Sequence, residues 1–81
     1  MAKTRKVSKL QKVVKESVDR YLKEVDGYEL GDLFSLVSNE VEKALLIRLN
    51  EHTLGNQSQM SRILGLSRIT LRRKLQTHGI A

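Results

Sequence analysis

The chain has 81 residues, enough for one small domain, and its 15 Lys and Arg residues outnumber nine Asp and Glu residues to give a net charge of +6. It has no Cys, which excludes a disulfide framework and a thiolate metal site. No apolar run approaches the length of a membrane span and no secretory signal peptide is visible, while the absence of Pro and the helical spacing of apolar residues predict an all-α fold.

The charges are unevenly distributed along the chain. All nine acidic residues lie between Glu16 and Glu51, where only four cations accompany them. Residues 1–15 contain six cations and residues 52–81 contain five, and neither segment contains an acid. Two basic ends suggest a polyanionic partner, because Lys and Arg can neutralise phosphates. The alternatives are a charge that serves only solubility at the C-terminal end and a solvated tail at the N-terminal end.

A first helix is predicted after the basic N-terminal segment. Ser8 and Gln11 have the spacing of a capping box, so we expect this helix to begin at Lys9. Asp26-Gly27 is expected to end it. Its apolar residues form one stripe at helical spacing: Leu10, Val13, Val14, Val18, Tyr21, Leu22 and Val25.

A second, longer helix is predicted from the N-cap residue Asp32 to about Thr53. Leu36, Leu46 and Ile47 widen its apolar surface beyond a single stripe, and a helix that is apolar over so much of its girth needs burial on two fronts. We therefore predict a homodimer, the alternative being a compact monomer with a few exposed leucines. The predicted dimer interface consists of Leu33, Val37, Val41, Leu45, Leu46 and Leu49.

Local signals near the C-terminus predict a helix-turn-helix. Asn56 and Ser67 are both good N-caps, and Gly65 interrupts the pattern between them. Small Ser61 would let the two helices cross closely. The two helices are expected over residues 57–64 and 68–77. Their buried side is expected to consist of Met60, Ile63, Leu64, Leu66, Leu71 and Leu75.

The second helix of this pair carries four cations and no acid: Arg68, Arg72, Arg73 and Lys74. A helical corner needs no such charge for its stability, so this helix is predicted to read double-stranded DNA. Few aromatic residues argue against single-strand binding by base stacking. His52 and His78 lack a second ligand, so no metal site, cofactor or enzymatic activity is expected. His78 is expected to be exposed or to neighbour a phosphate.

Four segments resemble the Fis family, the factor for inversion stimulation and its relatives among bacterial nucleoid proteins. They are EVEKALL (40–46), GNQ (55–57), LG (64–65) and RITLRRKLQTHGI (68–80). The resemblance runs from Leu10 to the C-terminus. It implies one four-helix domain over 1–81, with a basic tail (1–9), dimerisation helices (10–53) and the helix-turn-helix (56–78).

The same resemblance implies an intertwined homodimer that binds and bends duplex DNA with few base contacts, so that specificity comes largely from deformability. It implies a cytoplasmic transcriptional regulator or architectural protein of the bacterial nucleoid, with RNA polymerase or other transcription proteins as candidate partners. The alternative function is a helical interaction module whose basic first helix binds an acidic protein or an anionic membrane.

Site residues follow from the resemblance by position. Arg68 matches the family's main base-contacting arginine, which suits bidentate contact with guanine. Ser67 stands where the family commonly has Asn, and its shorter side chain reaches less far. The other matched positions are expected to contact the DNA backbone: Asn56, Gln57, Ser58, Thr70, Arg72, Arg73 and Lys74.

The chain also departs from the family pattern. The nine residues before Leu10 are too few for the mobile hairpin with which some members contact a recombinase, so recombinase activation is not expected and the basic tail could contact DNA instead. Ala44 lies where many members have Pro, which predicts a less kinked second helix. Gln76 and Thr77 stand where well-known members carry lysines, which predicts a weaker grip on flanking DNA.

Overall fold

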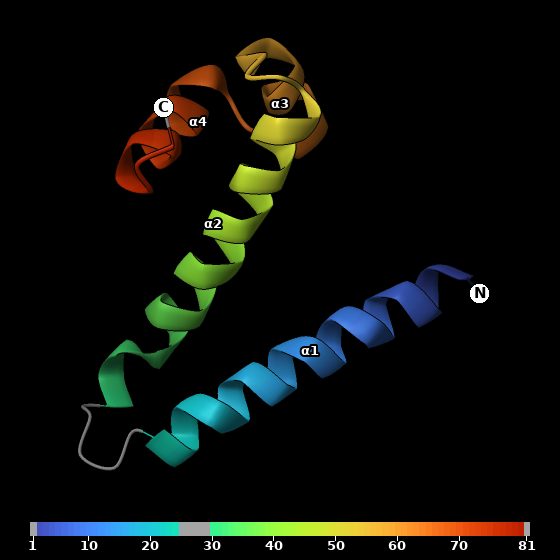
Figure 1. Ribbon diagram of the computed structural model, residues 1–81, viewed down its shortest axis with the longest axis vertical. Coiled ribbons are helices and arrows are strands. Elements are labelled where there is room, and N and C mark those ends of the chain that lie inside the picture. The colour runs from blue at the N-terminus through green and yellow to red at the C-terminus, as the bar shows by residue number, and fades with distance from the viewer. Residues whose placement is uncertain (1, 25–29, 81) are drawn as a thin grey trace. The chain divides into compact units, whose positions relative to one another are not determined.

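The computed structural model describes the backbone of residues 2–24 and 30–80 and the side chains of residues 9–24 and 31–80. The ordered elements in these ranges are all helical, which confirms the predicted all-α fold with a C-terminal helix-turn-helix (Figure 1). They form two units, residues 1–33 and 34–81. In chain order the elements are α1 (Ala2–Glu24), the 3₁₀ turn η1 (Leu30–Asp32), α2 (Leu33–His52), α3 (Gln57–Leu64) and α4 (Arg68–Thr77).

Helix α1 begins at Ala2 and not at Lys9 as predicted. Residues 2–8 contain neither Gly nor Pro, so nothing in the local sequence stops the helix there, and Ser8 lies inside it instead of capping it. The predicted basic tail is therefore helical from Ala2. The predicted stop at Asp26-Gly27 lies outside the described residues.

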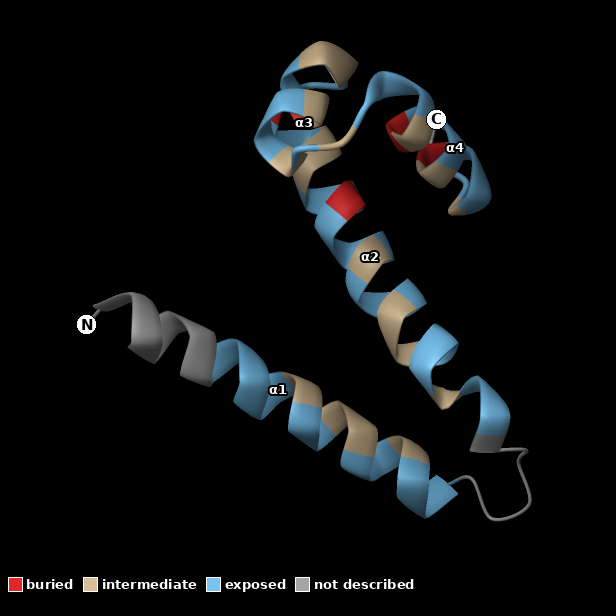
Figure 2. Cartoon of the chain, turned by 180° about the vertical axis from the view of Figure 1, so that it is seen from behind, coloured by how far each residue is buried: buried red, intermediate tan, exposed pale blue. Residues whose placement is uncertain are grey.

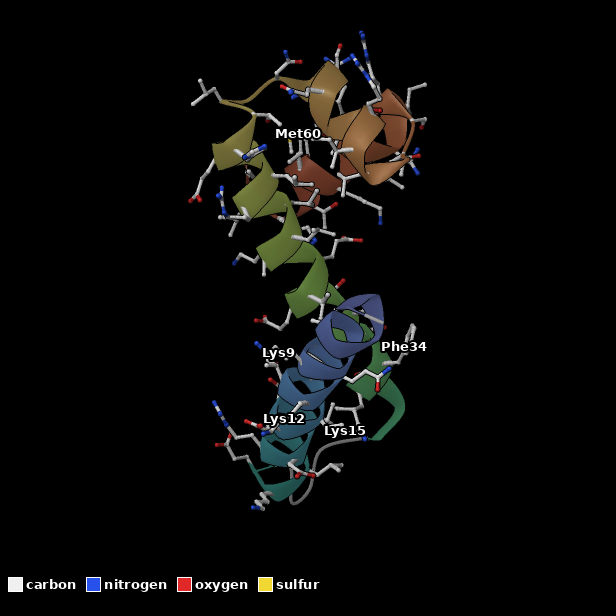
Figure 3. All side chains as sticks on the ribbon, turned by 90° about the vertical axis from the view of Figure 1, so that its right-hand side faces the viewer. Lys9, Lys12, Lys15, Phe34 and Met60 are labelled. Carbon is white, nitrogen blue, oxygen red and sulfur yellow. The ribbon has the colours of Figure 1, made fainter. Side chains whose placement is uncertain are left out.

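The described side chains make α1 amphipathic. Leu10 and Val13 on its apolar stripe are each 60% exposed. Lys9, Lys12 and Lys15 follow one another at three-residue spacing and are also exposed (Figure 3). The helix thus combines an open apolar stripe with a row of cations.

In the second unit, α2 ends one residue before the predicted Thr53. The chain leaves the helix through Leu54 and Gly55, whose φ angles are 54° and 80°. The Gly55 amide donates to the Asn50 carbonyl at 2.9 Å, which satisfies an otherwise unpaired carbonyl at the helix end. Gly tolerates this left-handed conformation without a Cβ clash, whereas Leu54 adopts it at some cost.

The core of this unit lies between α2 and the helix-turn-helix. Leu46, Met60, Leu71 and Leu75 are each at most 2% exposed and pack into one cluster (Figure 2). Partly buried hydrophobic residues surround it: Leu49, Leu64 and Ile80. Each of the four buried side chains contributes about 1.5–3 kcal/mol by leaving water. Because one comes from α2, one from α3 and two from α4, the cluster fixes the helix-turn-helix on the end of α2.

Three side chains of this unit differ from the prediction. Leu46 and Leu49 were expected to face a second chain, but Leu46 is 1% exposed inside its own chain and Leu49 is half-buried against the same cluster. Leu46 and Leu49 lie on one face of α2 at helical spacing, together with the half-buried Glu42 and the buried Thr53, and this face packs against the helix-turn-helix. Ile63, expected on the buried side of α3, is 53% exposed.

A second apolar face of α2 remains open. Phe34, Val41 and Leu45 are 83%, 45% and 49% exposed, and Phe34 projects away from the ribbon in Figure 3. Val37 is half-buried and continues the same stripe at helical spacing. The predicted two-sided apolar character of α2 is therefore visible as one face buried against α3 and α4 and one face exposed.

Candidate nucleic-acid interface

Both helices of the helix-turn-helix begin at the predicted caps. The Asn56 side-chain oxygen accepts a hydrogen bond from the Gln59 amide at 3.1 Å, and Gly65 ends α3 with φ 73° while its amide donates to the Ser61 carbonyl at 2.9 Å. The Ser61 hydroxyl donates to the Leu66 carbonyl, so this small residue also braces the turn. The helix boundaries 57–64 and 68–77 are confirmed.

The hydroxyls in the first turn of α4 bond within that turn. The Ser67 Oγ accepts from the Thr70 amide at 3.2 Å and donates to the Thr70 Oγ1 at 3.0 Å. Ser67 therefore caps α4, as the sequence predicts. These two hydrogen bonds fix the positions of both hydroxyls and stiffen the start of the helix.

Arg68 connects the two helices. Its exposed guanidinium donates a hydrogen bond from Nη2 to the Ser58 hydroxyl on α3. The structure thus brings together two residues, ten positions apart, that were both assigned to the site. Asn56 is exposed at the N-cap of α3, and Gln57 is half-buried. A guanidinium held at one point retains other donors for an external acceptor.

The outward face of α4 is defined by the residues opposite its core. Leu71 and Leu75 are buried, so the exposed residues at spacings of three, four and seven from Ile69 share the far side. These are Arg72, Arg73 and Gln76. The face carries positive charge with no acid in residues 52–81. This arrangement can present cations and donors to a polyanion.

The inner edge of α4 is tied to α2 by an ionic cluster. One Glu42 carboxylate oxygen lies 2.6 Å from Lys74 Nζ and the other lies 2.8 Å from His78 Nε2. Hydrogen bonds from Lys74 first and His78 second lower the pKa of Glu42 below its ordinary value. The His78 side chain is only 8% exposed.

This cluster changes two assignments. Lys74 was expected to grip phosphate, but its ammonium group is held by Glu42. His78 was expected to be exposed or to neighbour a phosphate, but it is enclosed and bound to the same carboxylate. Glu42 is 32 and 36 residues away from these partners, so the local sequence carries no signal of the cluster.

The described parts of the chain lack the features of two other kinds of site. Among the side chains of residues 9–24 and 31–80, no group of three His, Cys, Asp or Glu residues is placed to hold a metal ion. In the same ranges, no helix has both the length and the apolar character to cross a membrane.

Sequence comparison places these features among known proteins. The family profile described as "Bacterial regulatory protein, Fis family" matches residues 39–78, which contain the end of α2 and the helix-turn-helix. A Fis-like DNA-binding protein of Xylella fastidiosa strain 9a5c is 41% identical over 73 residues, covering 90% of this chain and 81% of the relative.

Two further relatives give similar values. The DNA-binding protein Fis of Aliivibrio fischeri strain MJ11 is 42% identical, and that of Haemophilus influenzae strain PittEE is 39% identical. Each match spans 71 residues, 88% of this chain and 72% of the relative. No solved structure matches the chain significantly. The identity and coverage of these relatives show that the chain belongs to the Fis family of bacterial regulatory proteins.

Proposed function

We propose that this protein binds double-stranded DNA by placing α4 in the major groove, as a regulatory and architectural protein of the bacterial nucleoid. The observation that carries the proposal is the exposed, acid-free outward face of α4 in a helix-turn-helix whose two helices both begin at a capped residue. The relatives at about 40% identity are named as DNA-binding proteins, which supports the same conclusion.

The DNA contact proposed for each side chain is based on its exposure and its hydrogen bonds. Arg68 reads guanine, because its guanidinium lies at the start of α4 and keeps donors beyond its bond to Ser58. Arg72 and Arg73 neutralise phosphates. Further backbone contacts are assigned to Asn56, Gln57, Ser58 and Thr70. Lys74 is assigned a weaker phosphate contact, because one of its three N–H donors binds Glu42. Ser67 serves as a cap.

The protein is proposed to act as a homodimer. The open face of α2 supplies the apolar surface through Leu33, Val37, Val41 and Leu45, with Phe34 added. Leu46 and Leu49 are removed because Leu46 is buried in its own chain and Leu49 packs against the same core. The apolar stripe of α1 needs burial as well, which suits an intertwined interface built from both helices of both chains. Two-fold symmetry would place two reading helices on one DNA site.

A dimer of this kind reads few bases and selects its sites by the ease of bending their centres. Transcription proteins, RNA polymerase among them, are the proposed protein partners, and the bacterial cytoplasm is the proposed location. The comparisons give no support to the alternative of a membrane-binding or acidic-protein-binding module.

The test compares binding of the full chain to a fluorescent 30-base-pair duplex and to anionic phospholipid vesicles over a range of salt concentrations. Duplex binding that weakens linearly on a log–log salt plot, with little vesicle binding, supports the proposal. The triple variant Arg68→Ala, Arg72→Ala, Arg73→Ala should lose the duplex, whereas Lys9→Ala, Lys12→Ala, Lys15→Ala removes as many cations from α1 and should retain most binding. Vesicle binding that depends on α1, without duplex binding, would overturn it.

A further inference from the structure

One side chain on the outward face of α4 is apolar. Ile69 is 72% exposed although it is a large β-branched residue. Helix propensity does not favour Ile69 at this position, because β-branched residues lower it slightly. The side chain also takes no part in the core, which Leu71 and Leu75 form on the opposite side of α4. A single exposed apolar side chain is common on protein surfaces, so only its position on α4 can indicate a function.

Ile69 follows Arg68 directly in the first turn of α4 and precedes Arg72 and Arg73 by one turn. In a helix-turn-helix, the N-terminal residues of the second helix approach the base edges in the major groove. The hydroxyls of Ser67 and Thr70, at the same end of the helix, bond each other at 3.0 Å. Arg68 and Ile69 are therefore the side chains in this turn that project from it.

An isoleucine cannot donate or accept hydrogen bonds, so it can recognise only the apolar part of a base edge. The major groove displays one such group on natural bases, the C5 methyl group of thymine. 5-Methylcytosine carries the same methyl group at the same ring position. A methyl contact there would remove apolar surface of both partners from water.

Building on the proposed function, we propose that Ile69 determines specificity by contacting the C5 methyl group of a thymine next to the guanine read by Arg68, once in each half-site. Arg68 and Ile69 then form a two-part reader, one polar and one apolar. The base next to the guanine is selected by contact, in contrast to the centre of the site, which is selected by shape.

The experiment begins with a duplex selected from random DNA by the wild-type protein. Each thymine of one half-site is replaced in turn by uracil, which lacks only the methyl group, and the dissociation constant is measured by fluorescence anisotropy. One position should lose about fourfold in affinity, as expected for one buried methyl group, and roughly fifteenfold when both half-sites are changed. At that position, 5-methylcytosine paired with guanine should bind more tightly than cytosine.

The Ile69→Ala variant should bind thymine and uracil duplexes equally. Leu54→Ala is the matched control, because Leu54 is 93% exposed but lies in the turn after α2, and it should discriminate like the wild type. A wild-type protein that is indifferent to every uracil, or an Ile69→Ala variant that keeps the full discrimination, would overturn the proposal. A protein that selects no duplex at all would instead overturn the proposed function.

Discussion

The first turn of α4 divides its side chains between structure and recognition. The hydroxyls of Ser67 and Thr70 bond each other and stiffen the helix start, whereas the Arg68 guanidinium extends to Ser58 on the preceding helix. Arg73 lies further along α4 and is exposed. These surroundings suit Arg68 to a fixed acceptor pair on a base and Arg73 to the mobile, repeated charge of phosphates.

Replacing the two arginines should therefore change DNA binding in different ways. Arg68→Ala should cost about 1–3 kcal/mol on a preferred duplex and much less on random DNA, because a bidentate guanine contact is lost. Arg73→Ala should weaken binding to both duplexes similarly and reduce the salt slope by about one unit. Anisotropy titrations on both duplexes at several salt concentrations measure this. Equal losses on the two duplexes for both variants would contradict the assignment.

Glu42 illustrates how one residue links two helices. Its carboxylate binds Lys74 and His78, and its pKa lies below the ordinary value of 4.5. A carboxyl group whose pKa is lower in the folded state binds its proton less readily there than in the unfolded chain. Its contribution to stability is therefore present above about pH 4.5 and is lost as the pH falls through the lowered pKa.

Glu42→Gln should reduce the free energy of unfolding by about 1 kcal/mol at neutral pH, since partly exposed ion pairs contribute on this scale. The difference from wild type should shrink below pH 4.5. Urea titrations at several pH values measure this, with Glu40→Gln as the control because Glu40 is exposed on α2. A difference that persists unchanged into acid would show that charge is not the cause.

Among the elements, the helix-turn-helix depends on one backbone conformation. Gly65 has φ 73°, and a Cβ added there would meet nothing within 4 Å. The residue is therefore required for its left-handed backbone and not for space. Its conformation directs the chain from α3 into α4.

Gly65→Ala should lower the free energy of unfolding by about 1 kcal/mol, because an L-residue is disfavoured in this conformation. Gly31→Ala is the matched control: its Cβ would also meet nothing within 4 Å, and its φ lies outside the left-handed region. Thermal unfolding followed by circular dichroism compares them. A Gly65→Ala protein as stable as Gly31→Ala would refute the conformational requirement.

A second prediction concerns the open face of α2. Leu45→Asp places a charge on the proposed interface and should dissociate the dimer or unfold it, because an unpaired buried charge is costly. Sedimentation equilibrium at micromolar concentration measures the change in mass. Leu54→Asp is the control, since Leu54 is 93% exposed and lies away from that face. A wild-type protein that sediments as a stable folded monomer would contradict the dimer.

For the whole molecule, the proposal combines two reading helices with DNA that bends between them. Each chain offers few side chains that can reach base edges, so the central base pairs of a site would remain unread. Sequence preference at such positions arises from the energy of deforming the duplex. The dimer would therefore select two short contact sequences and a flexible centre.

Changing that centre from A/T-rich to G/C-rich, with the end guanines intact, should cost on the order of 1–3 kcal/mol of binding free energy. The G/C centre should also resist bending, which circular-permutation gel electrophoresis measures. A duplex of equal composition whose changes lie outside the site serves as the control. Equal affinity for both centres, or straight DNA in the complex, would leave a rigid dimer on unbent DNA.

Local interactions made the helix-turn-helix predictable from the sequence. The caps Asn56 and Ser67 bond amides three residues ahead, and Gly65 supplies a conformation that few other residues adopt. These contacts lie within one helical turn, so residue type and spacing are sufficient to locate both helices. The start of α1 was missed because the capping signal at Ser8 competes with a segment that has no helix breaker.

The division of α2 into two faces was decided only by tertiary packing. Leu45 and Leu46 are adjacent and chemically identical, yet one is 49% exposed and the other 1%, because α3 and α4 cover only one side of the helix. The same packing brings Glu42 to Lys74 and His78 across 32 and 36 residues. Apolar spacing reveals how much of a helix needs burial, but the fold selects which face each partner covers.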